Sequence, residues 1–416
     1  MKQPARLKTF LAGLLAVAGM AAQAGDLRYA IWDKNQLPAI RTIIQQFEKA
    51  NPGIHVNVEL IPDSASNSQY WLKMEAAVTG GVAPDVMWMN MVNVQNYARN
   101  KAIIPLDDYI AKSGLKLEDF VPASVKSFNY QGRQYGLPRD IDSVAVWYNK
   151  KLFTEAGVAV PGNNWKWDDM TAAAQKLQQK HGRKVYPIFM DLLGNGQETY
   201  YNIIPSNGGN ILSADRTRSG MAEPQSVDAL RKLQALMGKG LIANVLQIGG
   251  VQGADLFQSG RVGMLYAGSW QAKPLTDNPA LKDQIGVVQM PALAKSVSVA
   301  HSLANVITQS SKNKDEAWKF VSFMAGDWAQ RQLASTRTVI PARLSAQADW
   351  VKAFPMDVSA YVNALGQSYP YPVSLYTAKW NKKLYEGLNK VWMGQDPAKV
   401  MPVVVSDVNQ ILASEK

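Results

Sequence analysis

The chain has 416 residues, with 44 Lys+Arg against 33 Asp+Glu and no cysteine. Without cysteine it cannot hold a disulfide framework, a thiolate metal site or a lipid-anchored cysteine. Its lysines are scattered rather than gathered in basic stripes, so the formal charge of +11 indicates a solvated surface rather than a nucleic-acid interface, with an anionic ligand as the alternative.

Residues 1–24 have the pattern of a cleavable secretory signal. Basic residues at positions 2, 6 and 8 precede an apolar run over 10–20, and residues 22–24 (Ala-Gln-Ala) match the small-x-small cleavage rule. A bilayer span needs roughly 20 apolar residues, so a membrane anchor is the weaker interpretation. We expect a mature chain that begins near Gly25, has 41 Lys+Arg against 33 Asp+Glu, and resides in the periplasm without a lipid anchor.

The first part of the mature chain alternates between strand and helix patterns. Apolar residues recur at helical spacing over 37–51, and a second helical stretch over 69–78 is ended by two glycines. Strand patterns occupy 26–32, 55–61 and 85–89. This alternation predicts a parallel sheet flanked by helices.

A polar cluster precedes the next strand. Arg139, Asp140 and Asp142 come directly before the alternating segment 143–149, which is followed by a helix that ends at Gly157. Polar side chains at the point where irregular backbone meets a strand can face a shared crevice without disturbing a core. We therefore expect a site here.

The remainder repeats the α/β plan. Helices are expected over 167–180, 227–237 and 315–324, strands over 184–190, 285–290 and 297–308, and a mostly helical tail from 345, clearest over 376–391. About 392 mature residues are too many for one ordinary core, so we expect two lobes. No Pro-rich or low-complexity linker occurs, which favours lobes joined by strands.

The usual catalytic constellations are absent from the sequence. The three histidines, His55, His181 and His301, are not at metal-ligand spacing, and no nucleophile elbow, zinc motif or phosphate loop occurs. Asp140 and Asp142 would lie about 7 Å apart on one face of a strand, which suits joint hydrogen bonding as well as hydrolysis. An enzyme is the alternative class, and no cofactor or metal is expected.

Aromatic residues favour a sugar ligand. The chain has 12 Trp and 16 Tyr against 10 Phe, and several tryptophans lie beside Asp, Asn or Gln in loop patterns. A sugar ring stacks its C–H face on an aromatic plane and offers hydroxyls to planar polar groups. Core packing is the alternative for each single tryptophan.

Three segments together resemble a known family: Tyr130 to Gly157, Phe257 to Trp270, and Lys312 to Arg343. They are similar to extracellular solute-binding proteins (family 1) that serve ABC importers of sugars, the maltose-binding-protein-like group. The resemblance implies two α/β lobes, each a mostly parallel sheet flanked by helices, joined by crossing strands. It divides the chain into an N-terminal lobe of 25–137 with 300–345 and a C-terminal lobe of 138–299 with 346–416.

The same resemblance implies a binding protein rather than an enzyme. Ligand would lie between the lobes, which close over it about hinges at 137–139, 299–301 and near 345. The implied partners are the membrane permease subunits of an importer with their ATPases, for a monomeric binding protein without nucleic acid or cofactor. A sugar of one or several units is the expected ligand, and an anionic polyol phosphate or acidic sugar is the alternative.

Site residues are carried over from the matching motifs. Asp142 is the main expected contact, and Trp270 is expected to stack on a sugar ring, with backbone groups of Gly268 and Ser269 beside it. The other expected contacts are Trp32, Asp33, Gln36, Gln69, Trp71 and Glu198. Arg139 and Asp140, the neighbours of Asp142, could pair with each other or also contact the ligand.

Other positions carry two interpretations each. Asp85 could reach the ligand or be structural, and His301, where many members of the family have glycine, could contact ligand or fill the hinge. Arg337 could clamp an anionic ligand. Tyr376 and Trp380 could close over the ligand, although one amphipathic helix face explains their spacing equally well.

Overall fold

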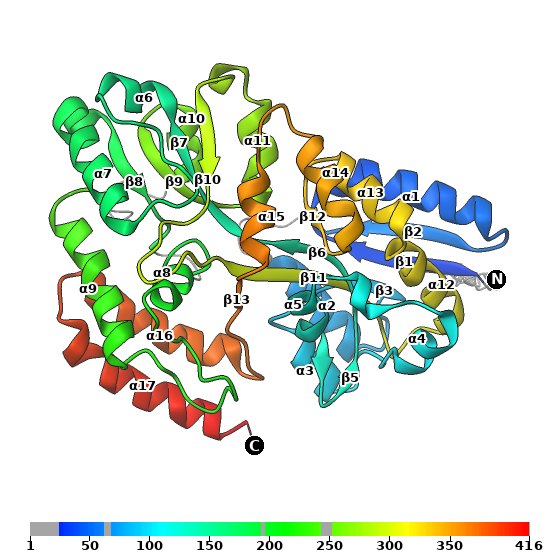
Figure 1. Ribbon diagram of the computed structural model, residues 1–416. Coiled ribbons are helices and arrows are strands. Elements are labelled where there is room, and N and C mark those ends of the chain that lie inside the picture. The colour runs from blue at the N-terminus through cyan, green and yellow to red at the C-terminus, as the bar shows by residue number, and fades with distance from the viewer. Residues whose placement is uncertain (1–24, 62–67, 193–195, 243–251, 416) are drawn as a thin grey trace, which may run out of the picture.

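The computed structural model of the protein describes residues 25–61, 68–192, 196–242 and 252–415. The expected signal at 1–24 lies outside the described residues. Two lobes lie side by side, and β6 and β11 are at the centre where they meet (Figure 1). In the described part of the chain, no helix has both the length and the apolar character needed to cross a bilayer.

Each lobe is built on its own sheet. The N lobe has a seven-stranded sheet in the order β12-β6-β11-β3-β1-β2, with β13 beside β11, and the C lobe has a four-stranded sheet in the order β10-β7-β9-β8. The strands are β1 Asp26–Ile31, β2 His55–Leu60, β3 Val86–Asn90, β4 Asn129–Tyr130, β5 Arg133–Gln134, β6 Leu137–Asp142, β7 Val144–Asn149, β8 Tyr186–Phe189, β9 Val262–Gly268, β10 Ile285–Val288, β11 Val299–Ile307, β12 Ile340–Pro341 and β13 Tyr369–Pro370.

Helices cover both sheets. They are α1 Leu37–Ala50, α2 Ser68–Thr79, α3 Val94–Arg99, α4 Asp107–Ser113, α5 Pro122–Ser127, α6 Lys150–Glu155, α7 Trp167–His181, α8 Tyr200–Ser206, α9 Pro224–Gly238, α10 Gly253–Gln258, α11 Ala272–Asp277, α12 Lys314–Met324, α13 Asp327–Ser335, α14 Gln347–Lys352, α15 Ser359–Leu365, α16 Thr377–Trp392 and α17 Pro397–Ala413. In Figure 1, α16 and α17 pack together on the outer side of the C lobe.

In the first elements, the apolar residues whose spacing predicted the secondary structure are also the residues that are buried. Helix α1 begins with Pro38 in its first turn and buries one apolar stripe, which includes Ile40, Ile43 and Phe47. Strand β1 pairs in parallel with β2 and with β3, so the expected βαβ start is confirmed. Gly157 has φ +63°, the left-handed conformation that ends the α6 turn as expected.

The expectation of mostly parallel sheets is wrong. In the N lobe β11 runs antiparallel to both β3 and β6, and in the C lobe β7 runs antiparallel to both β9 and β10. The reason is connectivity, because β11 brings the chain back from the C lobe in the direction opposite to β6, which led it out. The two-lobe α/β plan itself is confirmed.

The first crossing between sheets falls at Ser143, a few residues after the expected boundary at 137. All of β6 belongs to the N-lobe sheet, and its last residue, Asp142, pairs with His301 of β11. Beyond this pair, the backbone pairing between β6 and β11 ends, and a side-chain hydrogen bond follows: Ser298 Oγ accepts from the Val144 N–H at 2.7 Å. The exact lobe boundaries stay a prediction.

A third connection runs through α14 and α15. Helix α14 packs against α13 and β12 of the N lobe, whereas α15 packs against β7 of the C lobe. Tyr361 of α15 anchors this contact, because its carbonyl accepts a hydrogen bond from Ser143 Oγ at 2.7 Å. The segment therefore joins the two lobes at the place where the first crossing occurs.

Candidate functional site

Arg139 is an interior residue that organises the end of β6. Its side chain is fully buried, and its guanidinium donates hydrogen bonds to Asp140 Oδ2 and Gln36 Oε1. The guanidinium carbon also lies 4.2 Å from the centre of the Trp88 ring. Because its charge is neutralised inside the N lobe, Arg139 is not a free cation for an anionic ligand.

Asp140 and Asp142 differ in their surroundings although they are two residues apart. Asp140 is fully buried, and its Oδ1 accepts the Leu303 N–H at 3.1 Å. Burial raises the pKa of Asp140, and the Arg139 guanidinium opposes that shift. Asp142 lies at the junction of the lobes, where its Oδ1 accepts a hydrogen bond from Ser269 Oγ at 2.8 Å. Of the two carboxylates, Asp142 is the one placed beside the C lobe.

His301 lies between Asp142 and a tyrosine that the sequence did not nominate. Its Nδ1 is 3.9 Å from Asp142 Oδ2, and its ring centre is 5.4 Å from that of Tyr371 in an edge-to-face arrangement. The side chain is 17% exposed. This packing supports the hinge-filling alternative, and contact with ligand stays a prediction.

The end of β9 forms the C-lobe side of the junction. The Gly268 N–H donates to Glu198 Oε1 at 2.8 Å, and the Trp270 ring packs so closely on Gly268 that a Cβ there would lie 2.1 Å from ring atoms. Trp270 itself is 36% exposed. Only glycine at 268 permits this packing, so the backbone and the exposed ring form one unit.

Glu198 has an unusual protonation equilibrium. The residue is half-buried, while its carboxyl group is enclosed by neighbouring atoms. This burial raises the pKa of Glu198 to about 7, and the hydrogen bond from Gly268 opposes the shift. Near neutral pH the carboxyl group can therefore either donate or accept a hydrogen bond.

Four aromatic residues of the N lobe, Trp32, Tyr70, Trp71 and Trp88, form a cluster. Half-buried Trp32 lies edge-on against Trp88 and Tyr70, each with ring centres 4.8 Å apart, and 6.0 Å from half-buried Trp71. The Trp88 ring also packs against the Arg139 guanidinium, so the aromatic cluster contacts the polar residues at the end of β6.

A short polar relay follows the cluster along the chain. Asp33 caps the turn that follows β1, and its Oδ2 accepts a hydrogen bond from the side-chain amide of Gln36 at 3.0 Å. Gln36 is buried and also accepts from Arg139, so it faces the interior. Gln69 is exposed in the first turn of α2.

Asp85 and Arg337 each have a hydrogen-bond or ion-pair partner other than the residues around Asp142. Asp85 lies just before β3, at the end of that strand away from Asn90, which is the residue that pairs with Leu303 of β11. Its carboxylate accepts hydrogen bonds from the Arg28 N–H at 2.9 Å and from Ser311 Oγ at 2.6 Å. This supports its structural interpretation. Arg337 forms an ion pair with Asp277 at 2.7 Å. Its charge is therefore paired in this arrangement, and a role in clamping an anion stays a prediction.

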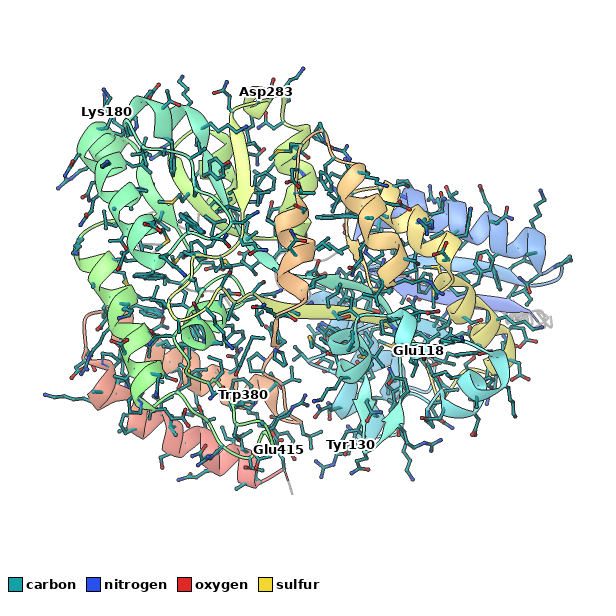
Figure 2. All side chains as sticks on the ribbon, viewed as in Figure 1. Glu118, Tyr130, Lys180, Asp283, Trp380 and Glu415 are labelled. Carbon is teal, nitrogen blue, oxygen red and sulfur yellow. The ribbon has the colours of Figure 1, made fainter. Side chains whose placement is uncertain are left out.

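Trp380 is a core residue, because it is fully buried in α16 and its Nε1 donates to Ser374 Oγ at 2.9 Å. Figure 2 places it among the C-terminal helices. The amphipathic-face interpretation of its spacing from Tyr376 is the right one for Trp380. Tyr376 is half-buried with Lys379 Nζ 4.1 Å from its ring centre, and its role stays a prediction.

Several residues at the junction were not nominated from the sequence. They are Trp88, Ser143, Ser298, Tyr361 and Tyr371. Trp88 lies in a predicted strand, where core packing was the simplest interpretation. The tyrosines lie in a tail whose pattern predicted only helices, so no local signal indicated that they return to the hinge.

Ser269, Asp142 and His301 do not form a hydrolase triad. In a nucleophilic triad the imidazole stands between the hydroxyl and the carboxylate, so that it can take the proton. Here Asp142 lies between Ser269 and His301, and its Oδ1 accepts the hydrogen bond that the Ser269 hydroxyl donates. The arrangement can hold a carboxylate in place, but its imidazole lies beside Asp142 rather than beside the Ser269 hydroxyl.

Known proteins resemble the chain over most of its length. Residues 33–331 match the model for bacterial extracellular solute-binding proteins. A binding protein of Brucella abortus is 29% identical over 331 residues, 76% of this chain and 77% of that protein. The diacetylchitobiose-binding protein DasA of Streptomyces coelicolor is 23% identical over 361 residues, 83% of this chain and 80% of that protein.

A solved structure agrees with the fold. The ABC substrate-binding protein of Listeria monocytogenes in complex with cycloalternan superposes with a TM-score of 0.83 at 26% identity, covering 93% of this chain and 99% of that one. Together with the match over residues 33–331, this shows that the chain belongs to the family of bacterial extracellular solute-binding proteins.

Proposed function

We propose that this protein binds a neutral sugar of one or several units between its lobes and delivers it to the permease subunits of an ABC importer. The observation that carries the proposal is the unit formed by Trp270, Gly268 and Glu198 beside Asp142. It presents an aromatic face next to two carboxyl groups, the combination that a sugar ring with its hydroxyls requires. The names of the relatives support it, since DasA is a diacetylchitobiose-binding protein and the Listeria protein was solved with cycloalternan.

Charge favours a neutral ligand over an anionic one. Arg139 and Arg337, which were among the arginines considered for recognition of a phosphate or carboxylate, are each paired with an aspartate. The junction holds the carboxyl groups of Asp142 and Glu198 instead, which form hydrogen bonds with hydroxyls, and a carboxylate at Asp142 disfavours an anionic ligand. A polyol phosphate or acidic sugar is therefore the second candidate.

The proposed mechanism is a two-state hinge motion. Ligand stabilises the closed arrangement because only there do residues of both lobes contact it, and the permease recognises that arrangement. The hinge consists of the β6–β7 and β10–β11 crossings together with the α14–α15 segment. We place the protein in the periplasm as a monomer without cofactor, acting with permease subunits and their ATPases.

A thermal-shift panel tests the proposal. Maltose, maltotriose and N,N′-diacetylchitobiose represent neutral sugars, galacturonate an acidic sugar, and glycerol 3-phosphate a polyol phosphate. A ligand at about 100 times its Kd stabilises the native state by about 2.7 kcal/mol, which gives a readable shift. Stabilisation by a neutral sugar is expected; stabilisation by the anionic compounds alone would replace the proposal with the second candidate.

An activity control separates binding from catalysis. The sugar that stabilises the protein is incubated with it and the products are separated by chromatography. We expect the sugar to be recovered unchanged. Turnover that disappears in an Asp142→Asn variant would instead indicate a glycoside-active enzyme.

A further inference from the structure

Tyr361 lies outside the nominated site but touches its backbone. It is fully buried in α15, and its hydroxyl accepts a hydrogen bond from Trp147 Nε1 at 2.7 Å. The single proton of this hydroxyl lies within reach of two carbonyl oxygens, Ala267 at 3.1 Å and Gly268 at 3.3 Å, so Ala267 is the nearer acceptor of a shared hydrogen bond. Its hydrogen-bonding capacity is thus directed at the end of β9.

The peptide between Ala267 and Gly268 is held on both sides. Its carbonyl oxygen, on Ala267, accepts from Tyr361, and its N–H, on Gly268, donates to Glu198. In a trans peptide these two groups point in opposite directions, so the two side chains together determine the orientation of the plane. Donation to the carbonyl also polarises the peptide and strengthens its N–H as a donor.

That peptide determines where the sugar-facing groups lie. The Trp270 ring packs directly on Gly268, and Ser269 donates from its N–H to the Ser143 carbonyl at 3.0 Å and from its Oγ to Asp142. Ser143 in turn donates to the backbone carbonyl of Tyr361. A rotation of the 267–268 peptide would therefore move the Trp270 ring and the partner of Glu198 together.

We infer that Tyr361 is a positioning residue for sugar recognition: through the 267–268 peptide its hydroxyl sets the orientation of the Trp270 ring and the Glu198 carboxyl group. The inference rests on the proposed function for the nature of the ligand. It assigns a specificity role to the α15 segment, which lies far along the chain from Glu198 and Trp270.

The test is Tyr361→Phe, which removes only the hydroxyl. A matched control is available in the N lobe, where the Tyr29 hydroxyl accepts from Trp88 Nε1 at 2.6 Å and donates to Asn305 Oδ1 at 2.8 Å. Tyr29→Phe deletes the same kind of relay away from β9, so both variants leave a buried tryptophan N–H unpaired. Urea unfolding of both variants measures the stability that each one loses, and we expect comparable losses.

The decisive measurement needs no ligand. The full-length protein is labelled with 5-fluorotryptophan, and the fluorine signal of Trp270 is assigned as the one that Trp270→Phe removes. In Tyr361→Phe that signal should shift or broaden, whereas in Tyr29→Phe it should stay in place. An unchanged Trp270 signal in Tyr361→Phe would overturn the inference even if stability falls, because a merely structural hydroxyl would not act at Trp270.

Affinity provides the second measurement. For whichever panel sugar binds the wild type, Tyr361→Phe should weaken binding roughly three- to ten-fold, the effect of one misplaced hydrogen-bonding group. Unchanged affinity would contradict the role in recognition. If no panel sugar binds the wild type, the proposed function fails separately, and the fluorine signal still decides whether Tyr361 positions Trp270.

Discussion

Ser269 Oγ donates a hydrogen bond to Asp142 Oδ1 at 2.8 Å, and the two residues belong to different lobes. Asp142 ends β6 of the seven-stranded sheet, and Ser269 follows β9 of the four-stranded sheet. The bond orients a carboxylate at the meeting point of the lobes and leaves Oδ2 for other partners.

Asp142→Asn tests the carboxylate. The substituted amide can still accept from Ser269 through its oxygen, so the fold should persist, but the charge that strengthens hydrogen bonds from sugar hydroxyls is lost. We expect affinity for the panel sugar to fall roughly ten- to one-hundred-fold by titration calorimetry. Asp85→Asn is the control, and it should lower stability and leave affinity unchanged. If Asp142→Asn left affinity unchanged while Asp85→Asn lowered it, Asp142 would be removed from the site.

Trp270→Ala tests stacking. Because the ring is 36% exposed, its removal should cost little stability, whereas sugar binding should fall at least ten-fold. Trp328, which is 42% exposed on α13, provides a matched control in Trp328→Ala. Equal affinities of the two variants would show that Trp270 does not contact the sugar.

Trp380→Ala should behave as a core truncation. Removing a fully buried indole is expected to lower the free energy of unfolding by about 3–5 kcal/mol, measured in urea. The milder Trp380→Phe should retain the affinity of the wild type for the panel sugar. A folded Trp380→Phe protein that no longer binds sugar would restore the ligand-contact interpretation.

Glu198 predicts a pH dependence of stability. Its pKa is raised to about 7 in the folded protein, so between about 4.5 and 7 the folded state holds a proton that the unfolded chain has released. The free energy of unfolding should therefore fall as pH rises through this window. Asp140 contributes in the same direction, so the informative quantity is the difference between wild type and Glu198→Gln in urea melts at pH 5 and pH 8. A constant difference would contradict the raised pKa.

Arg337→Gln tests the ion pair with Asp277. Arg337 follows α13 of the N lobe and Asp277 ends α11 of the C lobe, and both side chains are partly exposed. We expect a loss of less than about 1 kcal/mol in stability and no loss of sugar binding. Complete loss of binding by calorimetry would show that the guanidinium leaves Asp277 to meet the ligand.

The sequence predicted those parts of the fold whose pattern is local. Helix α1 and strand β2 agree with expectation within one residue, because their apolar spacing and their Asn-Pro-Gly boundary need no tertiary information. The change of sheet at Ser143 could not be located from the sequence, because β6 is held in the N-lobe sheet by pairing with β11, which lies far along the chain.

The site was predictable only where a motif carried it. Gly268, Ser269 and Trp270 were nominated because they occur together in one motif, and the structure joins them to Asp142 and Glu198; their contact with ligand stays a prediction. Arg139 and Trp380 each carried two interpretations, and the sequence could not choose between them because residue type and spacing do not distinguish an inward face from an outward one; the structure buries both side chains fully. Tyr361 gave no signal, since its role depends on a helix that returns to the hinge.

The position of β11 between β6 and β3 has a consequence for the order of folding. Residues 299–307 supply the strand that joins the two halves of the N-lobe sheet, yet they are synthesised after most of the C lobe. The first lobe to be made therefore cannot close until the chain has left it and come back, which gives high contact order and slow folding. A fragment that stops before residue 299 would leave β3 and β6 without their shared partner, as open edges ready to pair with another chain.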